Sequence, residues 1–392
     1  MMSFDFDRVI EQRNTHSQKW DSVQSRLGLS GPDILPMWVA DMDFQAPAAV
    51  SETLHRMANH GVFGYFGEDG EFKRAFCDWM RNRHQFEIDP DWIVNIHGVV
   101  AGLGFALQSF SEPGDGVVVF SPVYHAFGST IRAAGRNLIE SPLKIVQGRY
   151  EMDLELLDSQ IDERTKIMVL CSPHNPGGRV WSRQELIDIC KFCESRDLLL
   201  ISDEIHQDLV FEGHKHCVTA NAYPAIADRL ITLTAATKTF NVAASLTGHA
   251  IISDARLRDT FSNALRGAGS ASPNRVGIEM VTAAYAHGAD WLDALLPYIQ
   301  ANRDRFEEAV TRSIPGIRSM RLEATYLAWL DFSETGYSIE EATDRVQEIA
   351  RIAVNKGLSF GKGGENWLRF NIACPRATLE EAISRLQTAF AK

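Results

Sequence analysis

The sequence has no long apolar run, no surplus of positive charge and few cysteines, and each shortage disfavours a class of protein. No apolar stretch reaches membrane-spanning length, so we expect no membrane association. The 392 residues carry a formal net charge of -12, which disfavours nucleic-acid binding because that needs a basic face. Six scattered cysteines do not suggest a disulfide framework, and the first residues lack a basic stretch before an apolar core. We therefore expect a cytoplasmic protein without a signal peptide.

The cysteines and histidines that stand close together do not have the spacing of a zinc site. Cys190 and Cys193 lie within a helical pattern with no second pair, and we expect them on a buried stripe of that helix. His214, His216 and Cys217 lie in a glycine-bearing loop without a partner cluster elsewhere, and we expect a solvated loop. The sequence therefore predicts no metal centre.

The sequence does contain a regular alternation of apolar runs and helical patterns. Its 45% hydrophobic and 23% charged residues are typical of a globular chain. Short apolar runs predict strands over residues 92–96, 117–120, 166–170, 198–202 and 229–233. Continuous apolar strands separated by helices predict an α/β fold with a parallel sheet covered on both faces.

Polar and aromatic side chains follow the carboxyl ends of these strands. They are Tyr124, Asn175, Asp203, His206 and Lys238. Because the carboxyl ends of parallel strands meet at one edge of a sheet, we expect these side chains to line one crevice. A lysine at the mouth of a sheet is partly desolvated, which lowers the pKa of its amine and makes it usable as a nucleophile and base.

A glycine turn adds an anion site to this crevice. His97 and Gly98 separate the strand at 92–96 from a helical pattern that begins at Val99. Backbone N–H groups and the helix dipole favour an anion there. The glycine spacing is not the dinucleotide fingerprint, so we expect a phosphate instead. A lysine for an aldehyde, an aspartate for a pyridinium nitrogen, an aromatic for stacking and a phosphate site together suit pyridoxal phosphate.

From about Trp291 onward, strands and helices follow in mixed order. We expect helices over 291–312, 339–354 and 379–390, and strands over 325–331 and 367–372. This order predicts a smaller α+β domain over 291–392, beside a large domain over 47–290 and an N-terminal segment over 1–46 that packs with the small domain. Arg369 lies within an apolar strand, and a structural salt bridge or a clamp for a substrate carboxylate would explain it equally well.

The ordered set of motifs resembles the fold type I pyridoxal-phosphate enzymes, the aspartate aminotransferase superfamily, and within it the MalY/PatB branch of cystathionine β-lyases. The resemblance covers nearly the whole chain. It is carried by residues 38–44, 61–65, 171–176, 202–206, 237–241, 325–331 and 369–376. It implies a large α/β domain with a mostly parallel seven-stranded sheet and a smaller α+β C-terminal domain.

The resemblance also implies roles for single residues. Lys238 would hold pyridoxal 5'-phosphate covalently and move the Cα proton. Asp203 would pair with the pyridine nitrogen, Asn175 would bond the phenolic oxygen, and Tyr124 would stack on the ring. Further cofactor contacts are implied for His206, Thr237, the backbone amides of Val99 and Val100, and Tyr65. Substrate contacts are implied for Arg369, Asn175, Tyr124 and Ala40, with Arg369 clamping the α-carboxylate.

Tyr65 would reach the phosphate of a neighbouring subunit, which implies a homodimer with shared active sites. The chain also departs from the wider superfamily. His206 stands where aminotransferases usually have a tyrosine, Ala235 where many have a phosphate-binding serine, and Leu246 near the place of an arginine. Phosphate binding would then depend on backbone amides, Thr237 and Tyr65.

The resemblance implies a carbon–sulfur β-lyase that acts on a small amino acid. Cystathionine or another cysteine S-conjugate would be cleaved by β-elimination to a thiol, pyruvate and ammonia. Two alternatives stay open from the sequence. An aminotransferase would share the first steps, and a cofactor-binding regulator would use the fold as a sensor, although no basic DNA-reading segment precedes Met37.

Overall fold

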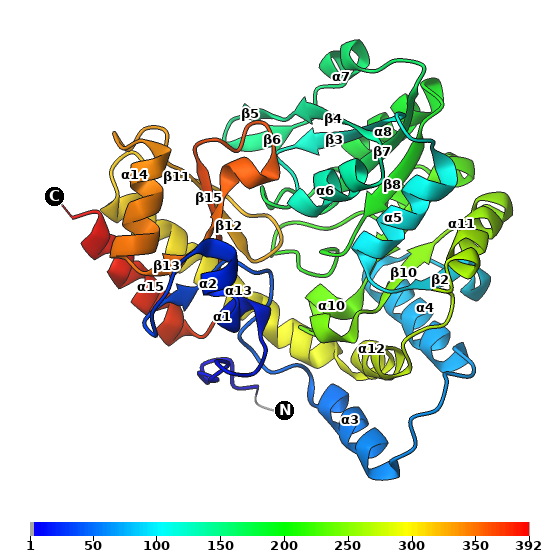
Figure 1. The fold of residues 1–392 in the computed structure, drawn as a ribbon, viewed down its shortest axis with the longest axis horizontal. Coiled ribbons are helices and arrows are strands. Elements are labelled where there is room, and N and C mark those ends of the chain that lie inside the picture. Colours follow the sequence, from blue (N-terminus) through cyan, green and yellow to red (C-terminus); the bar gives the residue numbers. More distant parts are fainter. Residues whose placement is uncertain (1–3, 392) are drawn as a thin grey trace.

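A twisted sheet of seven strands forms the centre of the molecule (Figure 1). The computed structural model describes residues 4–391; residues 1–3, within the stretch for which no signal peptide is predicted, and residue 392 lie outside it. The strand order is β2-β10-β9-β8-β7-β3-β4, and β10 alone in this sheet runs antiparallel to its neighbours. The strands are β2 (Ile93–Ile96), β3 (Gly116–Ser121), β4 (Asn137–Pro142), β7 (Thr165–Cys171), β8 (Leu199–Asp203), β9 (Leu230–Thr234) and β10 (Gly248–Ile251). The predicted parallel sheet is confirmed.

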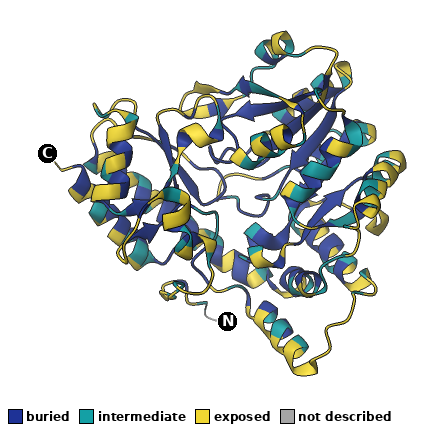
Figure 2. Cartoon of the chain, viewed as in Figure 1, coloured by how far each residue is buried: buried dark blue, intermediate teal, exposed yellow. Residues whose placement is uncertain are grey.

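Helices cover both faces of this sheet, and Figure 2 shows its inner strands almost wholly buried between them. Side chains of β3 alternate between two cores, with Val117 and Val119 on one face and Val118 and Phe120 on the other. This alternation follows from the two-residue period of a strand, and both faces are apolar because both are covered. The surrounding helices are α3 (Ala48–His60), α4 (Gly70–His84), α5 (Val99–Phe110), α6 (His125–Ala133), α7 (Leu154–Gln160), α8 (Arg183–Ser195), α9 (Thr219–Ala222), α10 (Ala236–Thr239), α11 (Ala255–Gly267) and α12 (Arg275–His287).

Local sequence explains where several of these helices begin and end. A capping box between Ser182 and Glu185 starts α8, and Gly61, with φ of 72°, ends α3. Cys190 and Cys193 lie fully buried on α8, as predicted. No helix within residues 4–391 is long and apolar enough to cross a membrane.

The C-terminal part forms a second, antiparallel sheet of four strands in the order β11-β12-β15-β14. These are β11 (Arg318–Met320), β12 (Leu327–Asp331), β14 (Asn355–Lys356) and β15 (Trp367–Asn371), with α13 (Ala289–Ser313), α14 (Ile339–Asp344) and α15 (Arg376–Ala389). Two short strands that follow β4 in the chain, β5 (Lys144–Val146) and β6 (Arg149–Glu151), pair with each other as a small antiparallel hairpin. The predicted domain boundaries at residues 46 and 290 stay a prediction.

One predicted helix is wrong in its length. The helix expected over 339–354 ends as α14 at Asp344, and a π-helical turn follows over 345–349. The chain then reverses at Arg351, with φ of 58°, into β13 (Ile352–Ala353). β13 pairs in parallel with β1 (Leu35–Pro36) of the N-terminal segment, which also contains α1 (Gln18–Asp21) and α2 (Val23–Leu27). Ile352 and Ala353, which continue the apolar helical pattern in the sequence, therefore form a strand, because β1 is available to pair with them.

Candidate active site

A cleft at the carboxyl ends of β7, β8 and β9 brings most of the predicted residues together. Its cavity has a volume of about 250 Å³. The predicted residues that line it are Ala40, Val99, Val100, Tyr124, Asn175, Asp203, His206, Thr237 and Lys238. Arg369 does not line this cavity but bonds to Asn175, which does. Tyr65 lies outside it and is fully exposed.

Lys238 lies on α10, which follows strand β9 of the large sheet. Its Nζ donates a hydrogen bond of 2.7 Å to the carbonyl oxygen of Ala40. Burial lowers the pKa of the Lys238 amine, while the carboxylate of Asp41 acts in the opposite direction. The lowered pKa increases the fraction of neutral amine at neutral pH, and the neutral amine is the form that acts as nucleophile and base.

Asp203 ends β8 and is almost fully buried. Its side chain accepts one hydrogen bond, 3.0 Å from the backbone N–H of Ile205 to Oδ1. Burial raises the pKa of this carboxyl to about 7. A buried carboxylate with so few donors is stabilised by a cation or a charged N–H group, and the protonated nitrogen of a pyridine ring is such a group.

Arg369 lies on β15 and is also buried. Its Nη1 donates to Asn175 Oδ1 at 3.1 Å, and its Nη2 donates to the carbonyl of Trp38 at 2.8 Å and to Asn355 Oδ1 at 2.9 Å. None of these partners is a carboxylate, and its Nε has no partner within the described residues. Burial lowers the pKa of Arg369 to about 10. The sequence left two interpretations of Arg369 open, a structural salt bridge and a clamp for a substrate carboxylate. This environment favours the clamp.

The start of α5 has the geometry expected for a phosphate site. Gly98 takes a positive φ of 92° directly before the first helical residue, Val99. The first N–H groups of a helix have no partner within it, so those of Val99 and Val100 remain available beside the cavity. Leu246, also with a positive φ, lines the same cavity and is exposed. At residue 246 the chain therefore has a leucine near the place where many relatives in the wider superfamily have an arginine, as noted in the sequence.

Four observations fit pyridoxal phosphate to this cleft. They are the lowered pKa of Lys238, the single hydrogen bond to the carboxylate of Asp203, the unpaired N–H groups at the start of α5, and the buried Nδ1 of His206, which has no partner in the described residues. Burial, with the nearby charge of Lys238, lowers the pKa of His206 to about 3, so this ring is neutral. Tyr124 lines the same cavity, where it can cover a flat ring.

Sequence reasoning missed the side chains that hold the segment 38–44 over the cleft. Tyr326 donates from Oη to the carbonyl of Ala40 at 2.9 Å, the same oxygen that accepts from Lys238. Asn241 donates to the carbonyls of Met42 and Phe44, at 3.0 and 2.8 Å. Asn371 bonds the carbonyls on either side of Ala40 in the same way. The only signal in the sequence was that these residues stand within the motifs of Lys238, Arg369 and the strand at 325–331.

The expectation for the loop at 214–217 was wrong in one respect. His216 is buried, and its Nε2 lies 2.8 Å from Glu204 Oε2. The loop folds back over the residues that follow β8, so that a histidine faces a buried carboxylate instead of water. Within residues 4–391, no group of histidine, cysteine, aspartate and glutamate side chains is arranged to hold a metal ion.

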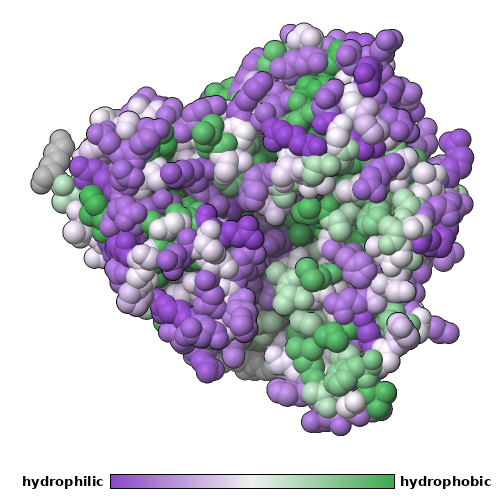
Figure 3. Space-filling model, in the orientation of Figure 1, coloured by the Kyte–Doolittle hydropathy of each residue, from purple (hydrophilic) through white to green (hydrophobic). Residues whose placement is uncertain are grey.

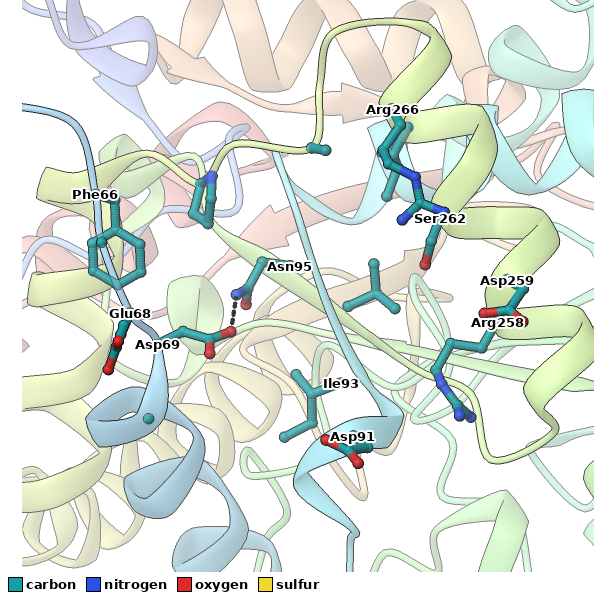
Figure 4. Close-up of a pocket in the computed structure, with 16 residues that line it drawn as sticks. Phe66, Glu68, Asp69, Asp91, Ile93, Asn95, Arg258, Asp259, Ser262 and Arg266 are labelled. Atoms are coloured by element: carbon teal, nitrogen blue, oxygen red, sulfur yellow. Dashed lines mark hydrogen bonds between the residues drawn. The ribbon is translucent and has the colours of Figure 1, made fainter.

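A larger cavity lies elsewhere, beside β2 and α11 (Figure 4). Its volume is about 710 Å³, and carboxylates and guanidinium groups both face it, among them Asp69, Asp259, Arg258 and Arg266. Asn95 donates to Asp69 across one wall at 3.1 Å. None of the predicted site residues lines this cavity, so size alone does not mark the place of the chemistry.

The fold and the cleft define a pyridoxal-phosphate enzyme of fold type I. The family model for aminotransferase class I and II matches residues 33–386, and the chain belongs to this family. PatB of Bacillus subtilis, named a cystathionine beta-lyase, is 39% identical over 98% of this chain and 99% of its own.

Solved structures agree with this assignment. Cystalysin from Treponema denticola, which contains pyridoxal 5'-phosphate, superposes with a TM-score of 0.94 at 35% identity over 99% of both chains. The pyridoxal-phosphate-bound C–S lyase from Staphylococcus hominis gives 0.92 at 29% identity, over 100% of this chain and 99% of its own. The cofactor of this chain is pyridoxal phosphate, and the chain is a carbon–sulfur lyase.

Proposed function

We propose that this enzyme cleaves cystathionine or a related cysteine S-conjugate by β-elimination, releasing a thiol, pyruvate and ammonia. The observation that carries the proposal is the pair formed by Lys238, with its lowered pKa, and Arg369, a buried guanidinium without a carboxylate partner in the described residues. Both are linked to the segment 38–44, so an amino acid held by its carboxylate at Arg369 would lie within reach of the Lys238 amine. The name of PatB supports the choice of sulfur substrate.

Each side chain has a role in this proposal. The bound cofactor supplies the electron sink for the carbanion at Cα. Lys238 anchors the cofactor and then removes the Cα proton. Asp203 holds the ring nitrogen protonated, Tyr124 covers the ring, and Asn175 bonds the ring oxygen as well as Arg369. The carbonyl of Ala40, which accepts from Lys238 in this structure, would accept from the substrate ammonium when the lysine moves away.

The remaining contacts belong to the phosphate and to the neighbouring subunit. Val99, Val100 and Thr237 would hold the phosphate, and His206 would close the cofactor site beside Asp203. We also propose a homodimer, since apolar side chains gather on the face near α3 (Figure 3). The exposed apolar residues of this part of the chain are Val62, Phe63, Tyr65, Leu246 and Val276. Such a patch is typical of a subunit interface, and Tyr65 would enter the partner's cleft from it.

Two further proposals concern the whole chain. The seven-stranded and four-stranded sheets support the division into a large domain over 47–290 and a small domain over 291–392, with the segment 1–46 attached to the small one through the pairing of β1 with β13. A cytoplasmic location is supported by the six free cysteines, five of them buried.

The test is to supply cystathionine and pyridoxal phosphate without any keto acid. Sustained release of pyruvate and thiol is expected, because β-elimination regenerates the enzyme without a second substrate. An aminotransferase would stop after one turnover, and that outcome would contradict the proposal. Lys238→Ala should lose activity by at least about 10³-fold, since this change removes both the covalent anchor and the base.

A further inference from the structure

The loop after β8 carries two further buried carboxylates besides Asp203, and one of them, Asp208, takes no part in the proposed chemistry. Its Oδ1 accepts a hydrogen bond of 3.0 Å from Trp79 Nε1 and lies 2.7 Å from His84 Nε2. Its Oδ2 accepts a bond of 2.7 Å from Thr239 Oγ1. Thr239 directly follows Lys238 in the chain. Asp208 therefore connects α4, through Trp79 and His84, to the turn that carries the lysine.

This turn needs such an anchor. Helix α10 has four residues, Ala236–Thr239, and so short a helix has no stability of its own in water. Its position therefore depends on bonds to the rest of the molecule. On one side Asn241 bonds the segment 38–44, and on the other Thr239 bonds Asp208.

The same loop bonds the other end of the lysine segment. Gln207 Nε2 donates to Thr234 Oγ1 at 3.1 Å, at the last residue of β9. Side chains from the loop 203–208 thus hold the chain four residues before Lys238 and one residue after it. The first residue of that loop is Asp203, the partner proposed for the ring nitrogen. The loop 203–208 is short and makes two side-chain hydrogen bonds to the chain around Lys238. It therefore sets how far the lysine-bearing turn lies from Asp203.

The charge of Asp208 gives these bonds their direction. Burial acts to raise the pKa of this carboxyl, but the bonds and charge of His84, with the bonds of Thr239 and Trp79, outweigh it and leave the pKa below its ordinary value. An ionised carboxylate only accepts hydrogen bonds, so the hydroxyl of Thr239 must donate. A bond to an ionised acceptor is shorter and roughly twice as strong as a neutral one.

We propose that Asp208, acting through the hydroxyl of Thr239, is a positioning residue that fixes the lysine-bearing turn relative to Asp203. Its effect is to hold the Lys238 amine where it meets the cofactor aldehyde and, later, the substrate Cα proton. Loss of the hydrogen bond between Thr239 and Asp208 leaves Lys238, Asp203 and the phosphate site chemically intact, but the position of the lysine is then no longer fixed.

The test replaces Thr239 by valine, which keeps the side-chain shape and removes the hydroxyl. The matched control is Thr219→Val, since Thr219 is fully buried and its hydroxyl lies 2.9 Å from Ser202 Oγ, beside the loop's other carboxylate, Glu204. Pyridoxal phosphate is added to each apoprotein, and its covalent attachment is followed by visible absorbance. Melting temperature, kcat and KM with cystathionine are measured alongside.

We expect attachment and kcat in Thr239→Val to fall at least threefold further than in Thr219→Val, with KM within about twofold of the unchanged chain. Thr239→Ser, which restores the donor, should recover both rates. A rate loss in Thr239→Val less than threefold beyond the control, or one that serine does not restore, would show a purely structural bond and overturn the proposal. Should the valine variant not fold, Thr239→Ala against Thr219→Ala decides by the same threshold.

Discussion

Among single residues, Asp203 is a carboxylate whose surroundings oppose its own charge. Its pKa rises from 3.8 to about 7 on burial, and one backbone N–H is its only hydrogen-bond donor within the described residues. A raised carboxyl pKa means that the folded state holds the proton more tightly than the unfolded state. Stability from this group is therefore fully present below pH 3.8 and is lost as the pH rises through about 7. The cofactor nitrogen would remove this penalty.

We therefore predict that Asp203→Asn stabilises the apoprotein at alkaline pH. At pH 8 the free energy of unfolding should rise by roughly 1–3 kcal/mol, and the difference should vanish near pH 4. Denaturant unfolding of the apoprotein at several pH values measures it. Affinity for pyridoxal phosphate should fall in the same variant, since an amide does not keep the ring nitrogen protonated.

Asp208 is the control of opposite sign. Its pKa lies below the ordinary value, so it stabilises the fold above the unfolded pKa and loses that effect as the pH falls. Asp208→Asn should therefore destabilise the protein at pH 8. If both substitutions shifted stability in the same direction, burial and hydrogen bonding would not be what sets the opposite pKa shifts of these two carboxyls.

The buried guanidinium of Arg369 leads to a second prediction at this scale. Arg369→Lys should lower kcat/KM for cystathionine by roughly 100-fold, mainly through KM, because a lysine cannot offer two parallel N–H groups to a carboxylate. Steady-state kinetics measure the effect. Arg136, which is also buried but bonds backbone carbonyls such as that of Leu107, is the control. Arg136→Lys should lower stability and leave KM unchanged; a KM equally raised in both would contradict the clamp.

Single residues were predictable from the sequence where chain position alone fixes their place. Lys238, Asp203 and Asn175 stand at strand ends, and parallel strands bring such ends together. Tyr326 and Asn371 could not be predicted in the same way. Their partners are backbone carbonyls of the segment 38–44, hundreds of residues away, and any segment offers carbonyls. Their role depends on a path of the chain that no local pattern encodes.

At the scale of elements, the segment 38–44 depends on a buried ion pair. Lys19 Nζ lies 2.7 Å from Asp43 Oδ2 and donates to the carbonyl of Asp41 at 3.0 Å. Asp43 also accepts from Gln12 at 2.8 Å and from Trp20 Nε1 at 3.2 Å. The N-terminal residues thus hold the segment 38–44 in place, and the carbonyl of Ala40 in this segment accepts a hydrogen bond from Lys238.

Lys19→Met should lower the free energy of unfolding by about 3 kcal/mol, because it leaves the carboxylate of Asp43 buried without its cation. Urea unfolding measures the loss. The exposed pair of Arg312 with Glu308 is the control, and Arg312→Met should change stability little. In the double variant Lys19→Met with Asp43→Leu, most of the lost stability should be recovered, because no buried charge is left unpaired. A double variant as unstable as Lys19→Met would refute this account.

The elements that the sequence predicts well are those with a long, self-contained pattern, such as α5, α13 and the parallel strands β2, β3, β7, β8 and β9 of the large sheet. Strands β4 and β10 of the same sheet were not predicted. The predicted helix over 339–354 was wrong for a physical reason. Ile352 and Ala353 are apolar whether they continue a helix or form a strand, and the partner that decides, β1, lies more than 300 residues earlier. Short strands in long-range pairs are set by tertiary contact and not by local propensity.

At the scale of the whole molecule, the loop 61–67 is exposed along almost all of its length. Tyr65 is fully exposed and does not line the cavity of its own chain, although the resemblance in the sequence implies a contact with the cofactor. An exposed tyrosine amid the exposed Val62 and Phe63 is unusual for a surface in contact with water. A symmetric dimer would bury these side chains and complete each cleft with the partner's Tyr65.

Subunit complementation tests this arrangement. Lys238→Ala and Tyr65→Ala are each expected to have little activity alone, and they are coexpressed with different affinity tags. In the mixed dimer one cleft receives both substitutions and the other neither, because Lys238 and Tyr65 of one chain serve different clefts. Random pairing should then restore about a quarter of the activity of the unchanged enzyme, and purified mixed dimers about half.

The result separates two placements of Tyr65 that a single variant cannot. If Tyr65 served the cleft of its own chain, each cleft of the mixed dimer would contain one defect, and activity would stay at the level of the parents. Sedimentation of the mixture checks that dimers form in either case. Tyr65→Phe keeps the ring and removes the hydroxyl, so its pairing with Lys238→Ala shows whether the oxygen or the apolar surface is the contribution across the interface.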